Sequence, residues 1–223
     1  IKTICYNFMP IVDWTRTQLD FKLPTDGLAL KFNYLQIIIF EIFILKLKNL
    51  ENRYSKKQIE DAEILYKKMK PKDLNNMKLS IMGGLPASNK IDSIGEFKKM
   101  LDVYKNVKAN DLRENLRDFI REIIPTAEEN NVKMAIHPDD PSIPLFGIPR
   151  IVSTYEDYKY ILNSYNSESN GITFCSGSLA SNSDNDIYKI FNKFKDKVNF
   201  IHLRNVKIEK DKKSFYESNH LDG

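Results

Sequence analysis

Short apolar runs alternate with helical patterns along the second half of the chain. The runs lie at 133–137, 171–175 and 198–203, and amphipathic segments separate them. Apolar runs of this length between helices are typical of buried strands. Strands linked by helices pair in parallel, because a parallel connection needs a long crossover. The pattern therefore predicts an α/β fold built on a parallel sheet.

The first half begins with a predicted strand at 2–7 and then turns helical. We expect a long loop at 8–26, of the kind that lies over a site, and an unpatterned loop at 205–223. Further helices are predicted at 31–48, 55–69, 74–81, 93–105, 111–130, 153–165 and 184–195, several of them with capping signals at Ser55, Ser93, Asp111 and Ser153. We expect one domain, 1–223, with a helical elaboration at about 31–110.

Composition narrows the class of protein. The chain has 223 residues, 42% of them hydrophobic and 29% charged, and its net charge of +4 comes from 34 basic and 30 acidic residues that are scattered along it. No basic block is interleaved with aromatics, so nucleic acid is not an expected partner. The most apolar stretch, 34–47, contains Glu41 and is shorter than the roughly 20 residues that cross a bilayer. This stretch therefore predicts a buried helix, and we do not expect a membrane as a partner.

Only two cysteines are present, Cys5 and Cys175. A disulfide framework needs more of them, which favours a reducing, cytoplasmic location. Cys5 is expected in the core.

Three residues with metal-binding side chains end the three predicted strands. They are His137, Cys175 and His202. Parallel strands about 4.8 Å apart bring their carboxyl ends to one rim, where such side chains can converge. Thiolate with imidazole suits zinc, iron or another late first-row ion rather than magnesium or calcium. The alternative is that each residue is a satisfied core side chain, since buried cysteine is a small hydrophobe.

Several residues near these three could have either a functional role or a purely structural one. Asp139 and Asp140 could orient an imidazole or position a substrate, or they could serve only the turn between two prolines. Arg204 could hold a carboxylate or remain solvated. Gly177 and Ser178 could allow close approach of a ligand to the backbone or form a plain turn.

Six blocks of sequence resemble the mannonate dehydratase family in their order and spacing, and together they span essentially the whole chain. The blocks are 5–17, 135–141, 146–154, 170–178, 202–205, and 214–217 with 220–223.

The resemblance implies a (β/α)8 TIM barrel of the xylose-isomerase-like type, of which the chain holds a part. It implies Mn²⁺ or Fe²⁺ held by two His, one Cys and one Asp, and dehydration of D-mannonate to 2-keto-3-deoxy-D-gluconate in glucuronate catabolism. His137, Cys175 and His202 match the first three ligands. The substrate contacts would then fall to Asn7, Asp140 and Arg204.

The sequence also departs from the family. The family has further βα units before the first strand, and a Pro-Asp-His-Gly-His stretch that would follow Gly223. That stretch carries the Asp ligand and the histidine expected to act as acid or base. We therefore expect a chain cut at both ends, lacking dehydratase activity by itself.

Two other functions stay open. One is a metal-dependent sugar isomerase or epimerase on the same barrel, and the other is a non-catalytic remnant. The expected partner is a small sugar acid, and a homo-oligomer is left open.

Overall fold

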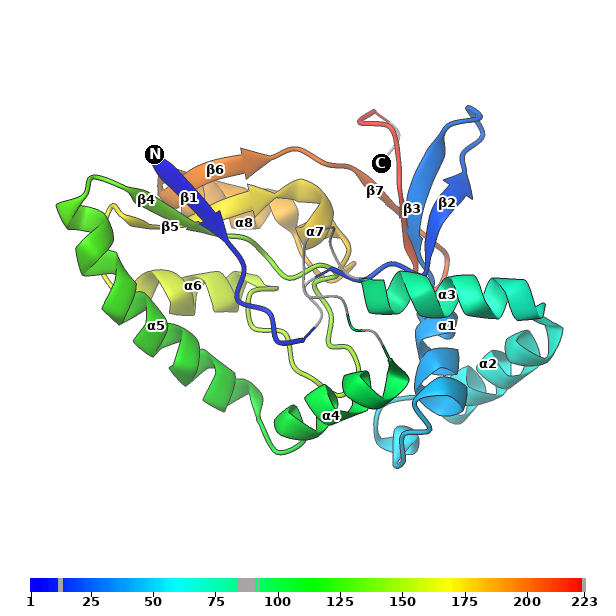
Figure 1. The fold of residues 1–223 in the computed structure, drawn as a ribbon. Helices are drawn as coiled ribbons and strands as arrows, with labels where there is room; N and C mark the ends of the chain where they lie inside the picture. The colour runs from blue at the N-terminus through cyan, green and yellow to red at the C-terminus, as the bar shows by residue number, and fades with distance from the viewer. Residues whose placement is uncertain (12–13, 84–90, 92, 222–223) are drawn as a thin grey trace.

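The computed structural model describes residues 1–11, 14–83, 91 and 93–221. A four-stranded parallel sheet forms its centre, with strand order β1-β4-β5-β6. The strands are β1 (Thr3–Tyr6), β4 (Lys133–Ile136), β5 (Asn170–Cys175) and β6 (Val198–His202). All four strands run in the same direction (Figure 1). Within this sheet, their order in space is the same as their order along the chain. The strands predicted at 2–7, 133–137, 171–175 and 198–203 are confirmed.

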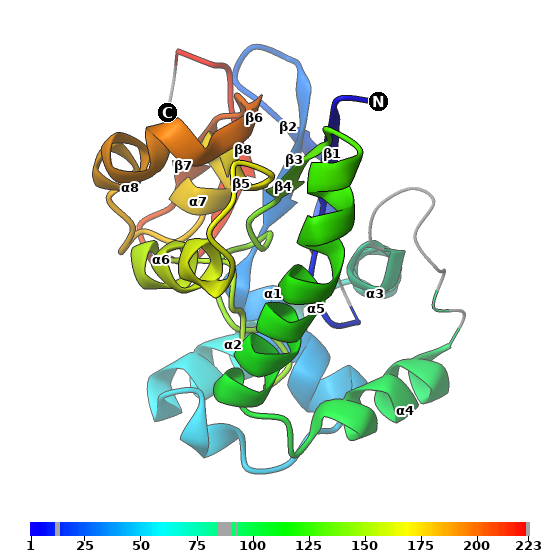
Figure 2. The same ribbon diagram turned by 90° about the vertical axis from the view of Figure 1, so that its left-hand side faces the viewer.

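Helices between these strands supply the crossovers. They are α5 (Ala109–Glu129), α6 (Tyr155–Ser164), the short α7 (Ser176–Ala180), α8 (Ile187–Phe194) and the 3₁₀ turn η3 (Lys195–Lys197). Helices α5 and α6 lie side by side (Figure 2). The apolar stripe of α5, including Leu116, Ile120 and Ile124, packs in one cluster with Ile136 of β4 and Ile172 of β5. The parallel sheet and its helices confirm the predicted α/β fold, a part of a TIM-like barrel.

A second sheet is antiparallel, with order β2-β3-β8-β7. Its strands are β2 (Gln18–Lys22), β3 (Leu28–Phe32), β8 (Phe215–Glu217) and β7 (Val206–Ile208). The predicted loops at 8–26 and 205–223 were therefore wrong where they include β2, β7 and β8. Strands of three to five residues carry too few positions for alternation to show, and the pairing of β3 with β8 joins distant parts of the chain.

The helical elaboration follows β3. It contains α1 (Tyr34–Ile39), the π-helical turn η1 (Phe40–Ile44), the 3₁₀ turn η2 (Leu50–Asn52), α2 (Lys56–Lys68), α3 (Pro71–Gly83) and α4 (Ile94–Tyr104). It begins slightly later than predicted because β3 runs to Phe32, and Asn33 then caps α1. Among the described residues, none of the helices is long and apolar enough to cross a membrane.

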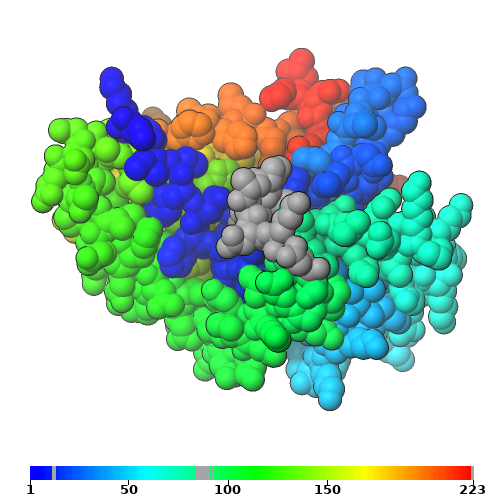
Figure 3. Space-filling model, in the orientation of Figure 1, coloured from blue at the N-terminus to red at the C-terminus, as the bar shows by residue number. Residues whose placement is uncertain are grey.

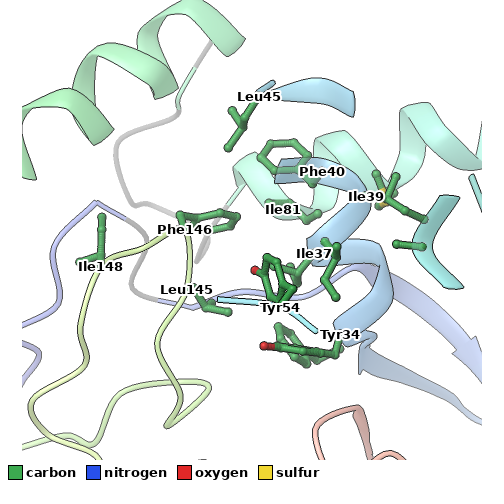
Figure 4. Close-up of a cluster of buried hydrophobic side chains, with 14 of the residues drawn as sticks. Tyr34, Ile37, Ile39, Phe40, Leu45, Tyr54, Ile81, Leu145, Phe146 and Ile148 are labelled. Carbon is green, nitrogen blue, oxygen red and sulfur yellow. The ribbon is translucent and has the colours of Figure 1, made fainter. Parts of the chain in front are cut away.

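Apolar side chains of the elaboration form a second core cluster (Figure 4). Phe40 packs edge-on against Phe146, with ring centroids 5.9 Å apart. Glu41 is fully buried beside them, and it binds Arg53 at 2.7 Å and accepts the backbone N–H of Phe146 at 3.0 Å. Because a buried carboxylate needs such partners, this pair connects the elaboration to the turn that carries Phe146.

Local capping chemistry sets several helix ends. Ser55 and Gln58 form the predicted reciprocal capping box, and Ser93 accepts the N–H of Glu96. Two predicted starts were wrong. Helix α6 is capped by Thr154 rather than Ser153, and α5 begins at Ala109, so Asp111 lies inside it and accepts the N–H of Lys108 at 2.8 Å. The Asp111 carboxylate caps the helix from its third position because it reaches back over the first turn.

Cys5 is exposed, and its predicted place in the core was wrong. Its strand, β1, lies at the edge of the parallel sheet. In Figure 3 the N-terminal segment, dark blue, lies on the surface of the molecule. The Cys5 Sγ atom contacts the Thr173 Oγ1 atom at 3.1 Å. Strand propensity alone could not distinguish an edge strand from a central one.

Gly171 allows Asn199 to cross the sheet, and we expect Gly171→Ala to destabilise the protein. Asn199 Nδ2 reaches the Met134 carbonyl oxygen at 2.8 Å, and an added methyl group would collide with that amide and lie 2.7 Å from the Lys197 carbonyl oxygen. Overpacking of this kind costs about 1–3 kcal/mol. Urea unfolding should show the loss.

The matched control is Gly95→Ala in α4, where the nearest atom to the new methyl group lies 3.8 Å away. Alanine is the better helix former, so this variant should be neutral or slightly more stable. Equal midpoints of unfolding for the two variants would contradict the packing argument.

Candidate metal centre

Three strands of the parallel sheet end at one rim with a metal-binding side chain. His137 directly follows β4, Cys175 ends β5 and His202 ends β6. The order β4-β5-β6 places Cys175 on the middle strand, and Cys175 and His202 are paired in register. This confirms the predicted arrangement on adjacent strands, which follows because strands joined by right-handed crossovers are neighbours.

The three side chains converge on a common point. One ligand atom from each lies within 4.8 Å of the other two. His202 Nδ1 is 3.5 Å from Cys175 Sγ and 3.4 Å from His137 Nε2. Ligands bound at about 2.0–2.3 Å in tetrahedral geometry lie roughly 3.3–3.8 Å from each other. The two distances from His202 fall in this range, and the third, between Cys175 and His137, is at most 4.8 Å, so the donor set suits one metal ion once these two side chains move closer together.

The surroundings of both imidazoles favour the neutral form that binds a metal ion. Desolvation lowers the pKa of His137, although the Pro138 carbonyl and Asp140 partly oppose the shift. Desolvation, His137 and Arg204 lower the pKa of His202. Both rings are therefore neutral at pH 7. His137 Nδ1 lies 2.8 Å from the Pro138 carbonyl oxygen, so the tautomer that donates this bond leaves Nε2 free as a ligand.

The Cys175 thiol is buried, and burial raises its pKa. Arg204 and a hydrogen bond from Ser178 partly oppose this shift. Ser178 Oγ lies 3.2 Å from Cys175 Sγ. Without an ion the thiol keeps its proton at neutral pH, and an arriving cation must displace it.

Asp139 belongs to the loop before α6. It accepts the Val152 N–H at 2.8 Å and the Ser153 hydroxyl at 2.9 Å, and Arg150 lies 3.7 Å away. Its side chain is 1% exposed, and desolvation raises its pKa. These contacts give Asp139 a role in holding 150–153 beside the rim.

Asp140 lies between two arginines. Arg16 donates to both of its oxygens, at 2.9 and 3.3 Å, and Arg204 Nη1 lies 2.7 Å from Oδ2. Burial would raise its pKa, but the two guanidinium groups outweigh that effect and hold the pKa well below its usual range. Asp140 is 2% exposed. Its oxygens are thus engaged by protein groups, which favours a role in positioning Arg204.

The other candidate residues lie around this rim. Asn7 directly follows β1 and is exposed, next to the Tyr6 carbonyl that accepts the His137 N–H at 2.7 Å. Gly177 and Ser178 lie in the first turn of the short helix α7, so they do not form a plain turn. His220, which the sequence alone assigned no role, lies 3.2 Å from the Leu203 carbonyl oxygen.

Sequence reasoning assigned no function to Arg16 or Glu217, which meet beside Asp140 with their charged atoms 2.9 Å apart. Both lie in blocks of the family resemblance, at 5–17 and 214–217. That was the only signal available, because the pairing joins residues 201 positions apart.

Comparison with known proteins assigns the chain to a family. The family model for D-mannonate dehydratase (UxuA) matches residues 1–223. The chain belongs to the D-mannonate dehydratase family. It is 41% identical to a mannonate dehydratase of Marinomonas sp. (strain MWYL1) and 40% identical to one of Saccharophagus degradans, in each case over all of its 223 residues.

The chain spans about half the length of its relatives. It covers 57% of the Marinomonas protein and 56% of the Saccharophagus protein. The crystal structure of mannonate dehydratase from Streptococcus suis serotype 2 superposes on it with a TM-score of 0.69 at 34% identity, covering 100% of this chain and 50% of that one. The fold of this D-mannonate dehydratase family member is therefore shared with a solved relative.

We expect Cys175→Ser to weaken metal binding far more than Cys5→Ser. A serine hydroxyl is a harder and much less acidic ligand than a thiol, whereas Cys5 is not among the three residues whose ligand atoms converge. The loss at Cys175 should exceed the roughly 10–100-fold that follows removal of a supporting contact. Metal content after dialysis measures it, and equal retention by both variants would exclude Cys175 as a ligand.

Metal binding should release one proton per ion. The raised pKa of Cys175 leaves a thiol that must ionise, while the lowered pKa values of His137 and His202 leave neutral rings that lose no proton. Affinity should then rise about tenfold per pH unit between about pH 7 and pH 8. Calorimetric titration in buffers with different ionisation enthalpies counts the protons, and an affinity independent of pH would contradict this assignment.

Proposed function

We propose that the protein to which this chain belongs dehydrates D-mannonate to 2-keto-3-deoxy-D-gluconate, with Mn²⁺ or Fe²⁺ at the metal centre. The observation that carries the proposal is the convergence of His137, Cys175 and His202 at one rim of the sheet. Family membership over the whole chain supports the reaction class. The support for the metal is the donor set, because imidazole and thiolate suit late first-row ions.

The reaction removes a weakly acidic proton next to a carboxylate and expels the neighbouring hydroxyl. A bound divalent ion would supply Lewis-acid stabilisation of the negative charge that develops on the substrate. His137, Cys175 and His202 are the residues that would hold it. The Pro138 carbonyl orients His137, because it lies 2.8 Å from the ring Nδ1.

Other groups at the rim are placed to bind and orient a sugar acid. The exposed Asn7 can offer its amide to a hydroxyl group. Arg204 brings a positive charge beside the ligands, and the neighbouring Asp140 raises its pKa against the opposing effect of burial. We propose that Arg204 attracts the substrate carboxylate chiefly through this charge, since its two terminal nitrogens already face Asp140 and Ser178.

Turnover of D-mannonate by the full-length protein tests the proposal. We expect a product that has lost one water and carries a keto group, formed only when Mn²⁺ or Fe²⁺ is present and abolished by a chelator. D-Gluconate, which differs from D-mannonate at the carbon that loses the proton, is the matched control and should not react.

Mass spectrometry distinguishes the alternatives. A product of unchanged mass would overturn dehydration in favour of isomerisation or epimerisation. No product from the metal-loaded protein would favour a non-catalytic remnant.

A further inference from the structure

Arg16 is a fully buried arginine outside the set of metal ligands. It lies just before β2, in a stretch that the sequence predicted to cover a site, and its side chain has no exposed surface. The guanidinium group lies over the Trp14 ring, 4.5 Å from its centroid, and 5.0 Å from the centroid of Phe215. Burial of a charged group is costly unless it is paired, so its partners must account for its position.

Those partners come from two distant parts of the chain. Arg16 makes two hydrogen bonds to Asp140, at 2.9 and 3.3 Å, and a third to Glu217 in β8 at 2.9 Å. Two-point binding of a carboxylate fixes direction as well as distance. The Thr15 N–H also donates to the Asp140 carbonyl oxygen at 3.2 Å. Arg16 therefore fixes the Asp140 carboxylate relative to the antiparallel sheet.

Asp140 passes this constraint to the metal centre. Its Oδ2 atom lies 2.7 Å from Arg204 Nη1 and 3.2 Å from the hydroxyl of Ser178. Ser178 is fully buried, and its Oγ atom lies 3.2 Å from Cys175 Sγ. A continuous line of contacts thus runs from Arg16 through Asp140 and Ser178 to the sulfur.

We propose that Arg16 is a positioning residue for the metal centre, acting through Asp140 on Ser178 and Cys175. This inference rests on the proposed metal centre. Arg16 balances the charge of Asp140 and holds its carboxylate, so the Ser178 hydroxyl and the sulfur keep one arrangement. Without Arg16 the carboxylate has Arg204 as its remaining arginine partner and can turn, which leaves Ser178 and Cys175 less ordered.

The experiment uses Co²⁺ as the probe and the full-length protein with Arg16→Met and Arg16→Lys. Cobalt bound by a thiolate gives a charge-transfer absorption that reports the metal–sulfur bond independently of activity. We expect Arg16→Met to weaken Co²⁺ binding about 10–100-fold and to shift or weaken this band. Arg16→Lys keeps the charge without the two-point geometry, so it should restore part of the affinity.

Arg53→Met is the matched control. Arg53 also pairs with a buried carboxylate, Glu41 at 2.7 Å, but in the helical elaboration. It should lower thermal stability without changing the cobalt spectrum. Ser178→Ala removes the hydroxyl that lies between Asp140, Arg204 and the sulfur. It should reproduce the spectral change of Arg16→Met, and the two effects should not add.

The outcomes separate the two proposals. A wild-type protein without the thiolate band would contradict the metal centre itself. A wild-type band that Arg16→Met leaves unchanged in position, intensity and affinity would overturn the role of Arg16 alone. If Arg16→Met does not fold, Ser178→Ala decides between the outcomes. An unchanged band in Ser178→Ala would show that Ser178 does not act on the sulfur, and this would overturn the proposed role of Arg16.

Discussion

Parallel pairing of β1, β4, β5 and β6 is the constraint on which the site depends. Because every strand runs in one direction, each carboxyl end arrives at the same rim, and the spacing between neighbouring strands sets how far apart the first side chains beyond it begin. His137, Cys175 and His202 occupy those positions on three consecutive strands. Their convergence is thus a consequence of backbone hydrogen bonding, with the side chains needing to span only short gaps.

Buried ion pairs tie the peripheral parts of the chain to this sheet. Glu41 with Arg53 holds the helical elaboration to the turn at Phe146, and Arg16 with Asp140 holds the antiparallel sheet to the rim. Breaking such a pair by removing one partner typically costs about 3–5 kcal/mol, because the other charge stays buried. The two ion pairs therefore specify how the helical elaboration and the antiparallel sheet pack against the parallel sheet. Apolar contacts specify orientation less well because they have little directionality.

The edge strand β6 shows a further consequence of a partial barrel. Phe200, Ile201 and Leu203 are exposed, and within the described residues no strand pairs with the far side of β6. His202 is also exposed there, whereas Cys175 on the middle strand is buried. An apolar open edge is a surface on which further strands pair. Within the candidate metal centre, exposure therefore increases from the middle strand to the edge strand.

The sequence by itself determined the parallel strands, the helices between them, the capping box at Ser55 and the three residues that converge at the candidate metal centre. These follow from local patterns: apolar runs, helical periodicity and the chemistry of the residue that ends each run. Only the tertiary structure decided the antiparallel sheet, the exposure of Cys5 and the pairing of Arg16 with Asp140. Short strands have too few positions to show a period, and burial at a sheet edge depends on what lies beside it. The sequence does not distinguish a buried arginine from an exposed one. The burial of Arg16 depends on Asp140, which lies 124 residues away in the chain.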